Sequence, residues 1–478
     1  MCGPSAYPDH QMIPPRLSWL LEPDGVPMQL SRLFAGAGHR LYLVGGSMRD
    51  ALLDRQHFDL DFATDANPGE IKAVVAGWAD SVFTVGEAFG TIGVVKDGYT
   101  HEVTTFRSEV YRNDSRKPHV AFTDDLEVDL SRRDFTINAI AVRLPDPELI
   151  DPHGGLGDLH ARLLRTPLAP EISFSDDPLR MLRLFRFMAT LEFEPDPAAL
   201  AAVVAMADRL SIISAERIRD ELSKLLLAPE PGRALLGMVR AGLTASIVPE
   251  LAALEMAQDP VHRHKDVLAH TMAVVDKTEP KLELRLAALL HDVGKPATRQ
   301  FSEGGATFHH HEVVGARMAR QRLRELRFPK RVVDDVSQLV FLHLRPHTFK
   351  MGWTDSAVRR YVRDAGDLLD DLNQLVRCDV TTRNRERARE IQDRIDELEE
   401  RIAQLREKEH LESLRPPING NDVMEYLSIP PGPQIGVVMD LLTEHRIEEG
   451  PYEAREAYRL VRAWAIEHGM DDPGEHGE

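Results

Sequence analysis

The chain has 478 residues, of which 43% are apolar and 28% are charged, and its formal net charge is −19. This length exceeds what one hydrophobic core ordinarily serves, so we predict about three or four domains. The composition excludes low-complexity and collagen-like proteins, and the negative charge argues against a protein that coats nucleic acid non-specifically.

The sequence contains no recognisable targeting signal. No apolar run approaches the roughly 20 residues that cross a bilayer, and the N-terminus lacks the basic start and apolar centre of a signal peptide. The two cysteines, Cys2 and Cys378, are far apart and support neither a disulfide framework nor a cysteine-rich metal site. We therefore expect a cytoplasmic protein without a membrane partner.

Residues 25 to 165 predict a small α/β unit, because short apolar runs bounded by glycine alternate with helical segments. The predicted strands are LYLVGG (41–46), FDLDFAT (58–64), TIGVVKDG (91–98), HEVTTF (101–106) and NAIAVRL (138–144).

The first predicted strand ends at Gly45 and Gly46. A Gly-Gly turn lets backbone N–H groups approach a ligand, and a helix from about Ser47 would direct its N-terminus to the same point, which favours a phosphate. Arg49 could add a charge-assisted contact. The same strand, turn and helix also occur without any ligand, so this pattern alone leaves both interpretations open.

The second predicted strand carries Asp59 and Asp61 two residues apart. On a strand both carboxylates face one side, while Phe58, Leu60 and Phe62 face the core. Adjacent carboxylates repel each other unless a cation neutralises them, and hard oxygen ligands of this kind suit Mg²⁺. The alternative is an edge strand with a solvated acidic face. The Gly-Gly turn close before the aspartates favours the metal site.

From Asp176 onward the strand signals almost disappear and helical spacing dominates. We predict helices with N-caps at Ser175 and Ser214, over residues 177–190, 196–210, 214–228 and 231–243. A histidine-rich helical block runs from about 256 to 380. Residues 383–414 then alternate in charge, with Ile391, Ile395, Leu398, Ile402 and Leu405 spaced by three or four. We interpret them as an exposed helical arm, the alternative being a surface helix of a bundle. PPINGND (416–422) ends it, and a last helical unit follows.

Ordered motifs in the first 250 residues resemble those of class II tRNA nucleotidyltransferases, the CCA-adding enzymes and their bacterial poly(A) polymerase relatives. The motifs are GGSMRD with the following DLD (45–50 and 59–61), RRDFTINAIA (132–141), DPHGGLGDLHARLLRT (151–166), DDPLRMLRLFRF (176–187) and ISAERIRDELSKLL (213–226). The resemblance implies a nucleotidyltransferase head of the DNA polymerase beta type, with a mixed sheet and helices.

The resemblance also implies roles for individual residues. Asp59 and Asp61 would bind the catalytic Mg²⁺, and Gly46, Arg49 and Arg133 would contact the nucleotide, with Asn138 nearby. Glu102, in HEVTTFR, is either a third carboxylate of this site or an ordinary strand residue.

Family enzymes read the incoming base with the motif Glu-Asp-x-x-Arg, which here is DDPLR (176–180). By this resemblance Asp177 and Arg180 pair with the base of CTP or ATP, and Arg183 and Arg186 lie near the nucleotide. A carboxylate accepts from the exocyclic amine that cytosine and adenine share, and neighbours at i and i+3 on a helix can pair with one base. The alternative is a set of salt bridges on a surface helix. Asp176 departs from the usual Glu, which shortens a supporting group.

The histidine block resembles the HD phosphohydrolases. Its motifs are VHRHKDVLAHT (261–271), ALLHDVGKPATR (288–299), FHHHEVVGA (308–316), FLHLRPH (341–347) and RCDVTT (377–382). The resemblance makes His270, His291, Asp292 and Asp379 metal ligands, and His311 and His343 could extend the site to a second ion. Imidazole with carboxylate suits Mn²⁺, Ni²⁺ or Fe²⁺. Whether this domain hydrolyses phosphodiesters, such as 2′,3′-cyclic ends, or serves as a helical scaffold stays open.

We therefore expect a multidomain α+β protein in four parts: a nucleotidyltransferase head (1–170), a helical neck that recognises the base (171–255), an HD-type metal domain (256–380) and a helical arm and tail that contact tRNA (381–478). The expected function is the addition of C, C and A to the 3′ end of immature tRNA from CTP and ATP, without a nucleic-acid template and without a protein partner. The alternatives are a poly(A) polymerase, an enzyme that adds only CC or only A, and an HD phosphohydrolase whose head merely binds nucleotide. A binding-only scaffold is the least favoured, because both sites retain acidic ligands.

Overall fold

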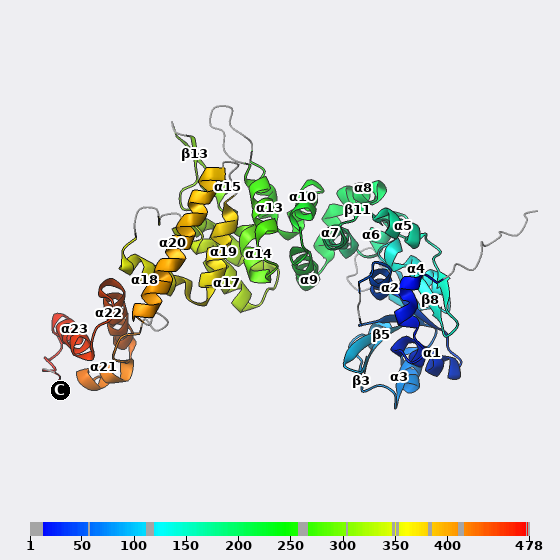
Figure 1. Ribbon diagram of the computed structural model, residues 1–478, viewed down its shortest axis with the longest axis horizontal. Helices are drawn as coiled ribbons and strands as arrows, with labels where there is room; N and C mark the ends of the chain where they lie inside the picture. Colours follow the sequence, from blue (N-terminus) through cyan, green and yellow to red (C-terminus); the bar gives the residue numbers. More distant parts are fainter. Residues whose placement is uncertain are drawn as a thin grey trace, which may run out of the picture. The chain divides into compact units, whose positions relative to one another are not determined.

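The computed structural model describes residues 13–474 and 476 (Figure 1). Within that range the residues left out are 56–57, 111–118, 257–265, 303–304, 347–348, 350–352, 381–384 and 410–414. The chain falls into two compact units, which we call unit 1 (Met1–Ala252) and unit 2 (Ala253–Glu478). A finer division into four parts stays a prediction. Among the described helices, none combines the length and apolar character needed to cross a membrane.

Unit 1 contains a mixed seven-stranded sheet in the order β3-β4-β5-β2-β1-β8-β9. β2 and β5 are parallel neighbours, and the other neighbouring pairs are antiparallel. All five predicted strands belong to this sheet. The bounds are β1 Leu41–Val44, β2 Asp61–Thr64, β3 Ser81–Phe83, β4 Thr91–Lys96, β5 Tyr99–Thr105, β8 Ala141–Leu144 and β9 Glu148–Ile150. A separate hairpin joins β6 (Arg107–Val110) to β7 (His119–Phe122).

Helices cover the sheet and bury its apolar side chains. One buried cluster contains Tyr42 and Val44 of β1, Phe106, and Leu126 and Leu130 of helix α4, together with neighbouring alanines. The helices of this part are η1 Pro15–Leu21, α1 Val26–Gly36, α2 Gly45–Leu52, α3 Pro68–Val75, η2 Glu87–Phe89, α4 Leu126–Ser131, η3 Thr136–Asn138 and α5 Gly155–Ala161. A short parallel pair, β10 (Leu163–Leu164) with β11 (Glu194–Pro195), connects this part to the helices that follow.

The predicted helices of the neck are present, with one error at a cap. They are α6 Pro170–Asp176, α7 Leu179–Leu191, α8 Pro197–Met206, η4 Ala207–Ile212, α9 Ala215–Leu226, α10 Gly232–Arg240, α11 Thr244–Ile247 and α12 Pro249–Ala253. Ser214 caps α9 by accepting a hydrogen bond from the Arg217 N–H, as predicted. The predicted cap at Ser175 is wrong, because Ser175 lies inside α6 and Pro178 precedes α7.

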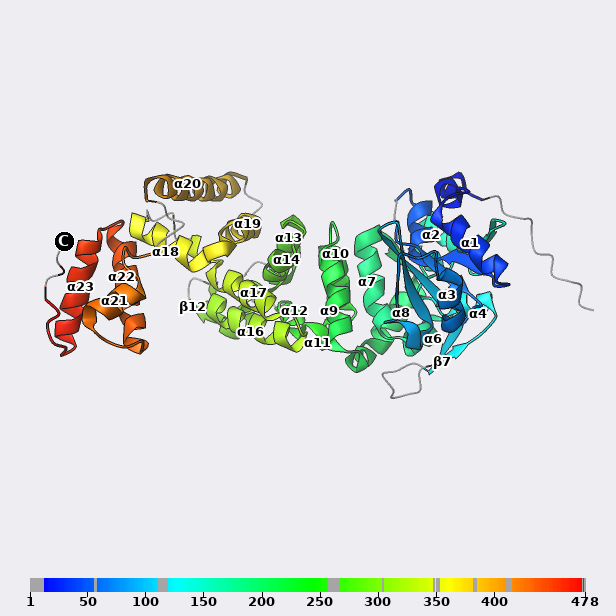
Figure 2. The same ribbon diagram turned by 90° about the horizontal axis from the view of Figure 1, so that it is seen from below.

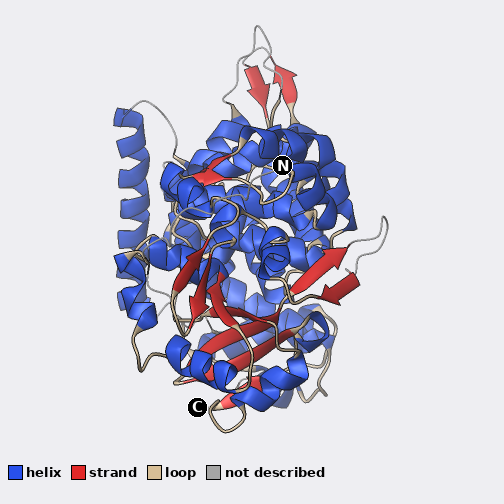
Figure 3. Ribbon diagram, turned by 90° about the vertical axis from the view of Figure 1, so that its right-hand side faces the viewer, coloured by secondary structure: helices blue, strands red, loops and turns tan. Residues whose placement is uncertain are grey.

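Among the described residues of unit 2, the strands are β12 (Gln300–Ser302) and β13 (Gly305–Thr307), which form a hairpin, and the other regular elements are helices. Figure 3 draws the strands of the chain in red and the helices in blue. The helices that surround the histidine block are α13 Val267–Lys277, α14 Leu282–Leu290, α15 Lys295–Thr298, α16 His311–Glu325, α17 Lys330–Leu342, α18 Asp355–Ala365, η6 Gly366–Leu368 and α19 Leu369–Asp379.

The predicted exposed arm is wrong for the described part of that segment. Helix α20 (Arg385–Glu409) lies along α18 and α19 (Figure 2), and it buries Ile395, Leu398, Ile402 and Leu405 there. The alternative interpretation, a surface helix of a bundle, is confirmed, because the apolar stripe finds a partner. Residues 383–384 and 410–414 of the predicted helix lie outside the described residues.

The predicted last helical unit consists of α21 (Gly420–Leu427), α22 (Pro433–Glu449) and α23 (Ala454–Glu467). These helices share a small core around Val438, Val461 and Trp464. Arg359 of α18 connects this core to the rest of unit 2, because its guanidinium ion-pairs with Glu409 at 2.9 Å and donates to the Ile447 carbonyl at 2.8 Å.

Candidate active site and candidate metal centre

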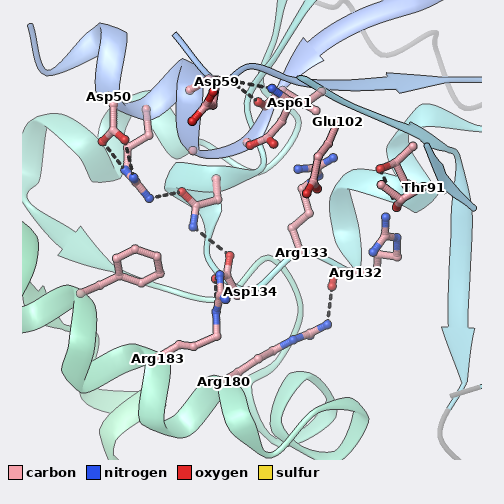
Figure 4. Close-up of a pocket in the computed structure, with 18 of the residues that line it drawn as sticks. Asp50, Asp59, Asp61, Thr91, Glu102, Arg132, Arg133, Asp134, Arg180 and Arg183 are labelled. Atoms are coloured by element: carbon pink, nitrogen blue, oxygen red, sulfur yellow. Dashed lines mark hydrogen bonds and ion pairs between the residues drawn. The ribbon is translucent and has the colours of Figure 1, made fainter. Parts of the chain in front are cut away.

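A large pocket in unit 1, with a cavity volume of about 1230 Å³, brings the predicted head and neck residues together (Figure 4). Its walls come from the sheet, from α2 and from the neck helices α7 and α9. Its lining includes all nine of the predicted residues, namely Gly46, Arg49, Asp59, Asp61, Arg133, Asp177, Arg180, Arg183 and Arg186.

Asp61 opens β2, whereas Asp59 lies just before the strand begins. The Asp59 carboxylate accepts a hydrogen bond from the Thr100 N–H at 3.1 Å. Leu60 and Phe62 are buried as predicted. The prediction for Phe58 is wrong: this ring is 47% exposed and packs against Trp19 and Tyr99, because the regular alternation starts only at Asp61.

Glu102 of β5 lies in the same pocket and is paired in register with Asp61 across the parallel strands. Partial burial and the nearby charge of Asp61 raise the pKa of Glu102. Three neighbouring carboxylates in one pocket fit a divalent cation, because a cation relieves their mutual repulsion and prefers oxygen ligands.

The Gly-Gly turn has a steric reason at its first residue. Gly45 has φ +77°, and a Cβ atom there would lie 3.0 Å from Asp61 Oδ2 and 3.2 Å from the Arg133 guanidinium. Helix α2 begins at Gly45, two residues before the predicted start at Ser47. The turn therefore brings the N-terminus of α2 directly beside Asp61.

A continuous set of hydrogen bonds runs from α2 to the neck along one wall of the pocket (Figure 4). Arg49 donates to Asp50 and, at 2.9 Å, to Asn138 Oδ1, whose amide donates to Asp134 at 2.9 Å. Arg183 then donates to Asp134 at 2.8 Å. The predicted position of Asn138 near the nucleotide contacts agrees with this arrangement.

Buried acids hold the pocket arginines, and the sequence analysis did not identify them. Despite burial, the charge of Arg183 keeps the pKa of Asp134 well below its usual range. Glu221 of α9 ion-pairs with Arg183 at 3.4 Å and with Arg186 at 3.2 Å. Burial and the neighbouring charge of Arg183 lower the pKa of Arg186 to about 10.

A third buried acid, Asp129, is fully buried and ion-pairs with Arg132 at 2.6 Å and Arg133 at 3.1 Å. Two of these acids stand close to arginines in the sequence. In the segment 129–134, Asp129 lies three and four residues before Arg132 and Arg133, and Asp134 follows them directly.

Asp177 and Arg180 both line the pocket, but they are not neighbours on one helix as predicted. Asp177 has an extended backbone before α7, because Pro178 separates it from that helix. The Asp177 carboxylate accepts from Arg217 at 2.7 Å. The buried Arg180 guanidinium donates to Ser173 Oγ at 2.9 Å and to the Arg132 carbonyl.

In unit 2 the structure gathers all the predicted histidine-block ligands. His270 Nε2 lies 2.8 Å from Asp379 Oδ1 and 3.5 Å from Asp292 Oδ2, and His291 Nε2 lies 3.3 Å from Asp292 Oδ2. His291 and Asp292 are 1% exposed, and His270 is 6% exposed. The ligand atoms of His270, His291 and Asp292 lie within 4.8 Å of one another, a spacing that fits one metal ion.

His311 and His343 form a second set with Asp292, again within 4.8 Å. Their Nδ1 atoms are hydrogen-bonded to the carbonyls of Phe308 and Val340, which leaves each Nε2 free to act as a ligand. Among the described residues the buried His343 Nε2 has no hydrogen-bond partner. Burial and the nearby His291 lower the pKa of His343 to about 3, so its imidazole is neutral. The donor set therefore fits a metal ion, or a pair of ions, bound by imidazole and carboxylate.

Lys295 was missed in the sequence analysis. Its ammonium lies 2.6 Å from Asp292 Oδ2, at the i+3 spacing that HDVGK displays.

Three known domain families match successive parts of the chain. Residues 41–165 match the Poly A polymerase head domain, residues 192–255 match the probable RNA and SrmB-binding site of polymerase A, and residues 266–405 match the HD domain. A curated A-adding tRNA nucleotidyltransferase of Deinococcus radiodurans is 33% identical over 440 residues, which cover 89% of this chain and 95% of that protein. The chain belongs to the tRNA nucleotidyltransferase family.

Two further relatives agree with this membership. The CCA-adding enzyme of Lactobacillus johnsonii is 43% identical over 212 residues, which is 44% of this chain and 52% of that protein. The crystal structure of the Bacillus stearothermophilus CCA-adding enzyme in complex with CTP superposes with a TM-score of 0.68 at 26% identity, over 95% of this chain and 99% of that one. The predicted fold, a nucleotidyltransferase head followed by a helical body with an HD domain, is confirmed. Head and HD families of this kind depend on divalent metal ions. The histidine cluster of unit 2 contains groups spaced to hold an ion, and the pocket of unit 1 offers carboxylate oxygens.

Proposed function

We propose that this protein adds C, C and A to the 3′ end of immature tRNA, from CTP and ATP, and releases pyrophosphate without a nucleic-acid template. The observation that carries the proposal is a single pocket that joins metal-binding carboxylates, a Gly-Gly turn and arginines from head and neck. Relatives that bear the name CCA-adding enzyme, including one solved with CTP, support it.

Asp59 and Asp61 are the residues that would hold Mg²⁺. A bound Mg²⁺ activates the attacking 3′ hydroxyl and stabilises the charge on the leaving pyrophosphate. The turn at Gly45 and Gly46 presents the N-terminus of α2 to the triphosphate. Arg49, Arg133 and Arg186, already fixed by buried acids or amides, offer guanidinium groups to the phosphates without reorganising.

Asp177 and Arg180 are proposed to read the base. Asp177 accepts from the exocyclic amine that cytosine and adenine share, and uracil and guanine lack that amine at the corresponding position. In the structure these two side chains already bind Arg217, Ser173 and the Arg132 carbonyl. Base reading therefore requires that these contacts be exchanged for contacts with the nucleotide.

Addition of the terminal A alone is a second candidate, favoured by one observation. The relative that matches along nearly its whole length, from Deinococcus radiodurans, is an A-adding enzyme. The two candidates differ in the acceptor that each uses, because an A-adding enzyme requires a tRNA that already ends in CC.

The experiment that separates them uses three acceptors: tRNA that lacks CCA, tRNA that ends in C and tRNA that ends in CC. Each is incubated with CTP, ATP or both, and the products are sequenced. Completion of CCA on all three supports the proposal, and extension of only the CC acceptor supports A addition. Extension by a long run of A would identify a poly(A) polymerase.

For the histidine cluster we propose a bound transition metal, Mn²⁺, Ni²⁺ or Fe²⁺, and hydrolysis of 2′,3′-cyclic phosphodiesters. The buried imidazoles with Nδ1 fixed by carbonyls support a metal of this type. Hydrolysis of 2′,3′-cyclic AMP that disappears with His291→Ala and Asp292→Ala would support the activity. Contact of residues 381–478 with tRNA, the absence of a protein partner and a cytoplasmic location stay predictions.

A further inference from the structure

The segment that carries the two proposed metal ligands lies at the end of a strand. β2 begins at Asp61, and its pairing with β5 begins at the same point, where Asp61 is opposite Glu102. Asp59 and Leu60 precede the paired residues, although Asp59 and Asp61 both border the pocket (Figure 4). The relative position of the two carboxylates therefore depends on contacts made where the regular strand pairing stops.

Three successive residues of β5 supply such contacts. The Thr100 N–H donates to the Asp59 carboxylate at 3.1 Å, and the Glu102 N–H donates to the Leu60 carbonyl at 2.9 Å. Between them, Nδ1 of His101 accepts a hydrogen bond from the Leu60 N–H at 3.4 Å. This N–H belongs to the peptide group that joins Asp59 to Leu60, so the imidazole contacts the backbone directly behind the first carboxylate.

The next peptide group is held by a side chain of α2. The buried Ser47 hydroxyl accepts a hydrogen bond from the Asp61 N–H at 3.3 Å and donates to the Val44 carbonyl at 3.0 Å. Two successive backbone N–H groups between the carboxylates, those of Leu60 and Asp61, are therefore each bound by a buried side chain, one from β5 and one from α2.

His101 occupies a core position of β5. It is 2% exposed, it shares its face of the strand with the fully buried Val103, and its ring lies edge-on to Phe62 with the centroids 6.4 Å apart. Because Nδ1 accepts a hydrogen bond, the imidazole is neutral and carries its proton on Nε2. Among the described residues, this buried Nε2 has no hydrogen-bond partner. A buried unpaired N–H costs free energy that an apolar side chain would avoid, which indicates that Nδ1 has a task.

We infer that His101 is a positioning residue, which orients the peptide between Asp59 and Leu60 through Nδ1 and so fixes the Asp59 carboxylate beside that of Asp61. His101 does not line the pocket, and it acts through the backbone of Leu60. The inference rests on the proposed function, in which these carboxylates hold Mg²⁺, and adds how their geometry is set. Residues that orient metal ligands commonly contribute about 10- to 100-fold to metal affinity.

The test measures Mn²⁺ binding through the electron paramagnetic resonance signal of free Mn²⁺. The parent protein carries His291→Ala and Asp292→Ala, which remove ligands of the cluster in unit 2. His101→Leu lacks the acceptor and should raise the Mn²⁺ dissociation constant about tenfold. His101→Asn should stay within about twofold of the parent, because its amide oxygen can take the place of Nδ1. His101→Gln should behave like His101→Leu, because its amide lies farther from the backbone, near the place of Nε2.

The Mg²⁺ dependence of CTP addition to tRNA that lacks CCA provides a second readout. In otherwise wild-type protein, His101→Leu should raise the half-saturating Mg²⁺ concentration by about the same factor, and most of the rate should return at saturating Mg²⁺. Val103→Ala is the matched control, because it opens a cavity on the same buried face of β5 and leaves the Leu60 N–H its acceptor. It should lower the stability in urea without changing the Mn²⁺ dissociation constant.

Three results would overturn the inference. The first is parental Mn²⁺ affinity in His101→Leu, and the second is a loss in His101→Asn as large as that in His101→Leu. The third is an equal loss in Val103→Ala, because core packing rather than Nδ1 would then set the metal affinity. If His101→Leu folds poorly, His101→Gln takes its place, since it also lacks an acceptor at the Nδ1 position.

Further measurements separate this inference from the proposed function. If wild type extends no tRNA, the proposed function has failed. If Asp61→Asn leaves the Mn²⁺ binding of the parent unchanged, the proposed metal ligands are wrong and the inference falls with them. If wild type extends tRNA and Asp61→Asn abolishes Mn²⁺ binding, but His101→Leu binds Mn²⁺ as the parent does, the inference alone has failed.

Discussion

In the pocket of unit 1 the carboxylates of Asp59 and Asp61 border about 1230 Å³ of open space, whereas in unit 2 His270, His291 and Asp292 are buried within a tight cluster. The open pocket must admit a nucleotide and the end of an RNA, so its charges are held by fixed partners along the walls. In the buried cluster the ligand atoms lie within 4.8 Å of one another, a spacing that fits a metal ion. If the pocket binds the nucleotide and the RNA end and the cluster binds metal, as we propose, a substitution in one site should leave the other site working.

The largest expected effect comes from Asp61→Asn. Asp61 is proposed to hold the catalytic metal, so its loss should lower the rate of nucleotide addition to tRNA by at least about 10³-fold, because a bound metal would supply several kcal/mol of transition-state stabilisation. Single-turnover kinetics with labelled ATP or CTP measures the loss. Asp54→Asn is the control: Asp54 is exposed, does not line the pocket, and forms a surface ion pair with Arg16. Retention of more than a tenth of the rate in Asp61→Asn would contradict the role of this residue.

The double substitution His291→Ala with Asp292→Ala should separate the two sites. Metal analysis of the purified protein should show that the transition metal of unit 2 is lost, because two of the clustered ligands are gone. Nucleotide addition should stay within about twofold of wild type, since the pocket of unit 1 holds its own ligands. A large loss of nucleotide addition in this variant would show that the two sites depend on each other, which would contradict their independence.

A smaller effect is expected for Asp134→Asn, which leaves Arg183 without its main charge partner. Asp134 is 9% exposed and the Arg183 side chain is 32% exposed. We expect a loss of about 2–3 kcal/mol in the free energy of unfolding, below the range for fully buried pairs because the arginine keeps some water. Urea unfolding measures it. Glu194→Gln, which breaks the exposed pair with Arg233, is the control and should cost no more than about 0.5 kcal/mol.

The smallest expected effect is the pH dependence of the stability that the Asp134 carboxylate contributes to the folded protein. The pKa of Asp134 is depressed in the folded state, so its stabilising contribution is present above the ordinary carboxyl pKa and is lost as the pH falls. The stability difference between wild type and Asp134→Asn should therefore be constant from about pH 5 to 7 and should shrink below about pH 4. A difference that grew on acidification would show that Asp134 is not stabilised as a carboxylate.

Sequence patterns predicted those features of the fold and the sites that depend on residues close together in the chain. The strands, the Gly-Gly turn, the aspartate pair and the histidine ligands all follow from local spacing, and the structure brings each of these sets together. Asp134 and Glu221 could not be assigned to Arg183 in this way, because they lie 49 and 38 residues from it along the chain. Asp129, three and four residues before its partners Arg132 and Arg133, could have been.

Two errors have equally specific causes. We predicted Asp177 on the helix of Arg180, but Pro178 precedes α7 and leaves Asp177 extended. The helix over Arg385–Glu409 looked like an exposed arm because most of its residues are charged, and nothing local indicates that α18 and α19 cover its apolar stripe. The first error has a local cause, since a residue before proline is disfavoured in helical conformation. The second depends on packing between segments that are far apart in the sequence.

The most direct test of the account is to sequence the products formed on tRNA that lacks CCA, with CTP and ATP present, by wild type, Asp61→Asn and the double variant of His291 and Asp292. In an incubation just long enough for wild type to complete its CCA ends, we expect complete ends for the double variant as well and no detectable extension by Asp61→Asn. Complete CCA ends formed by Asp61→Asn, or their loss in the double variant alone, would contradict the assignment of nucleotide transfer to the pocket of unit 1.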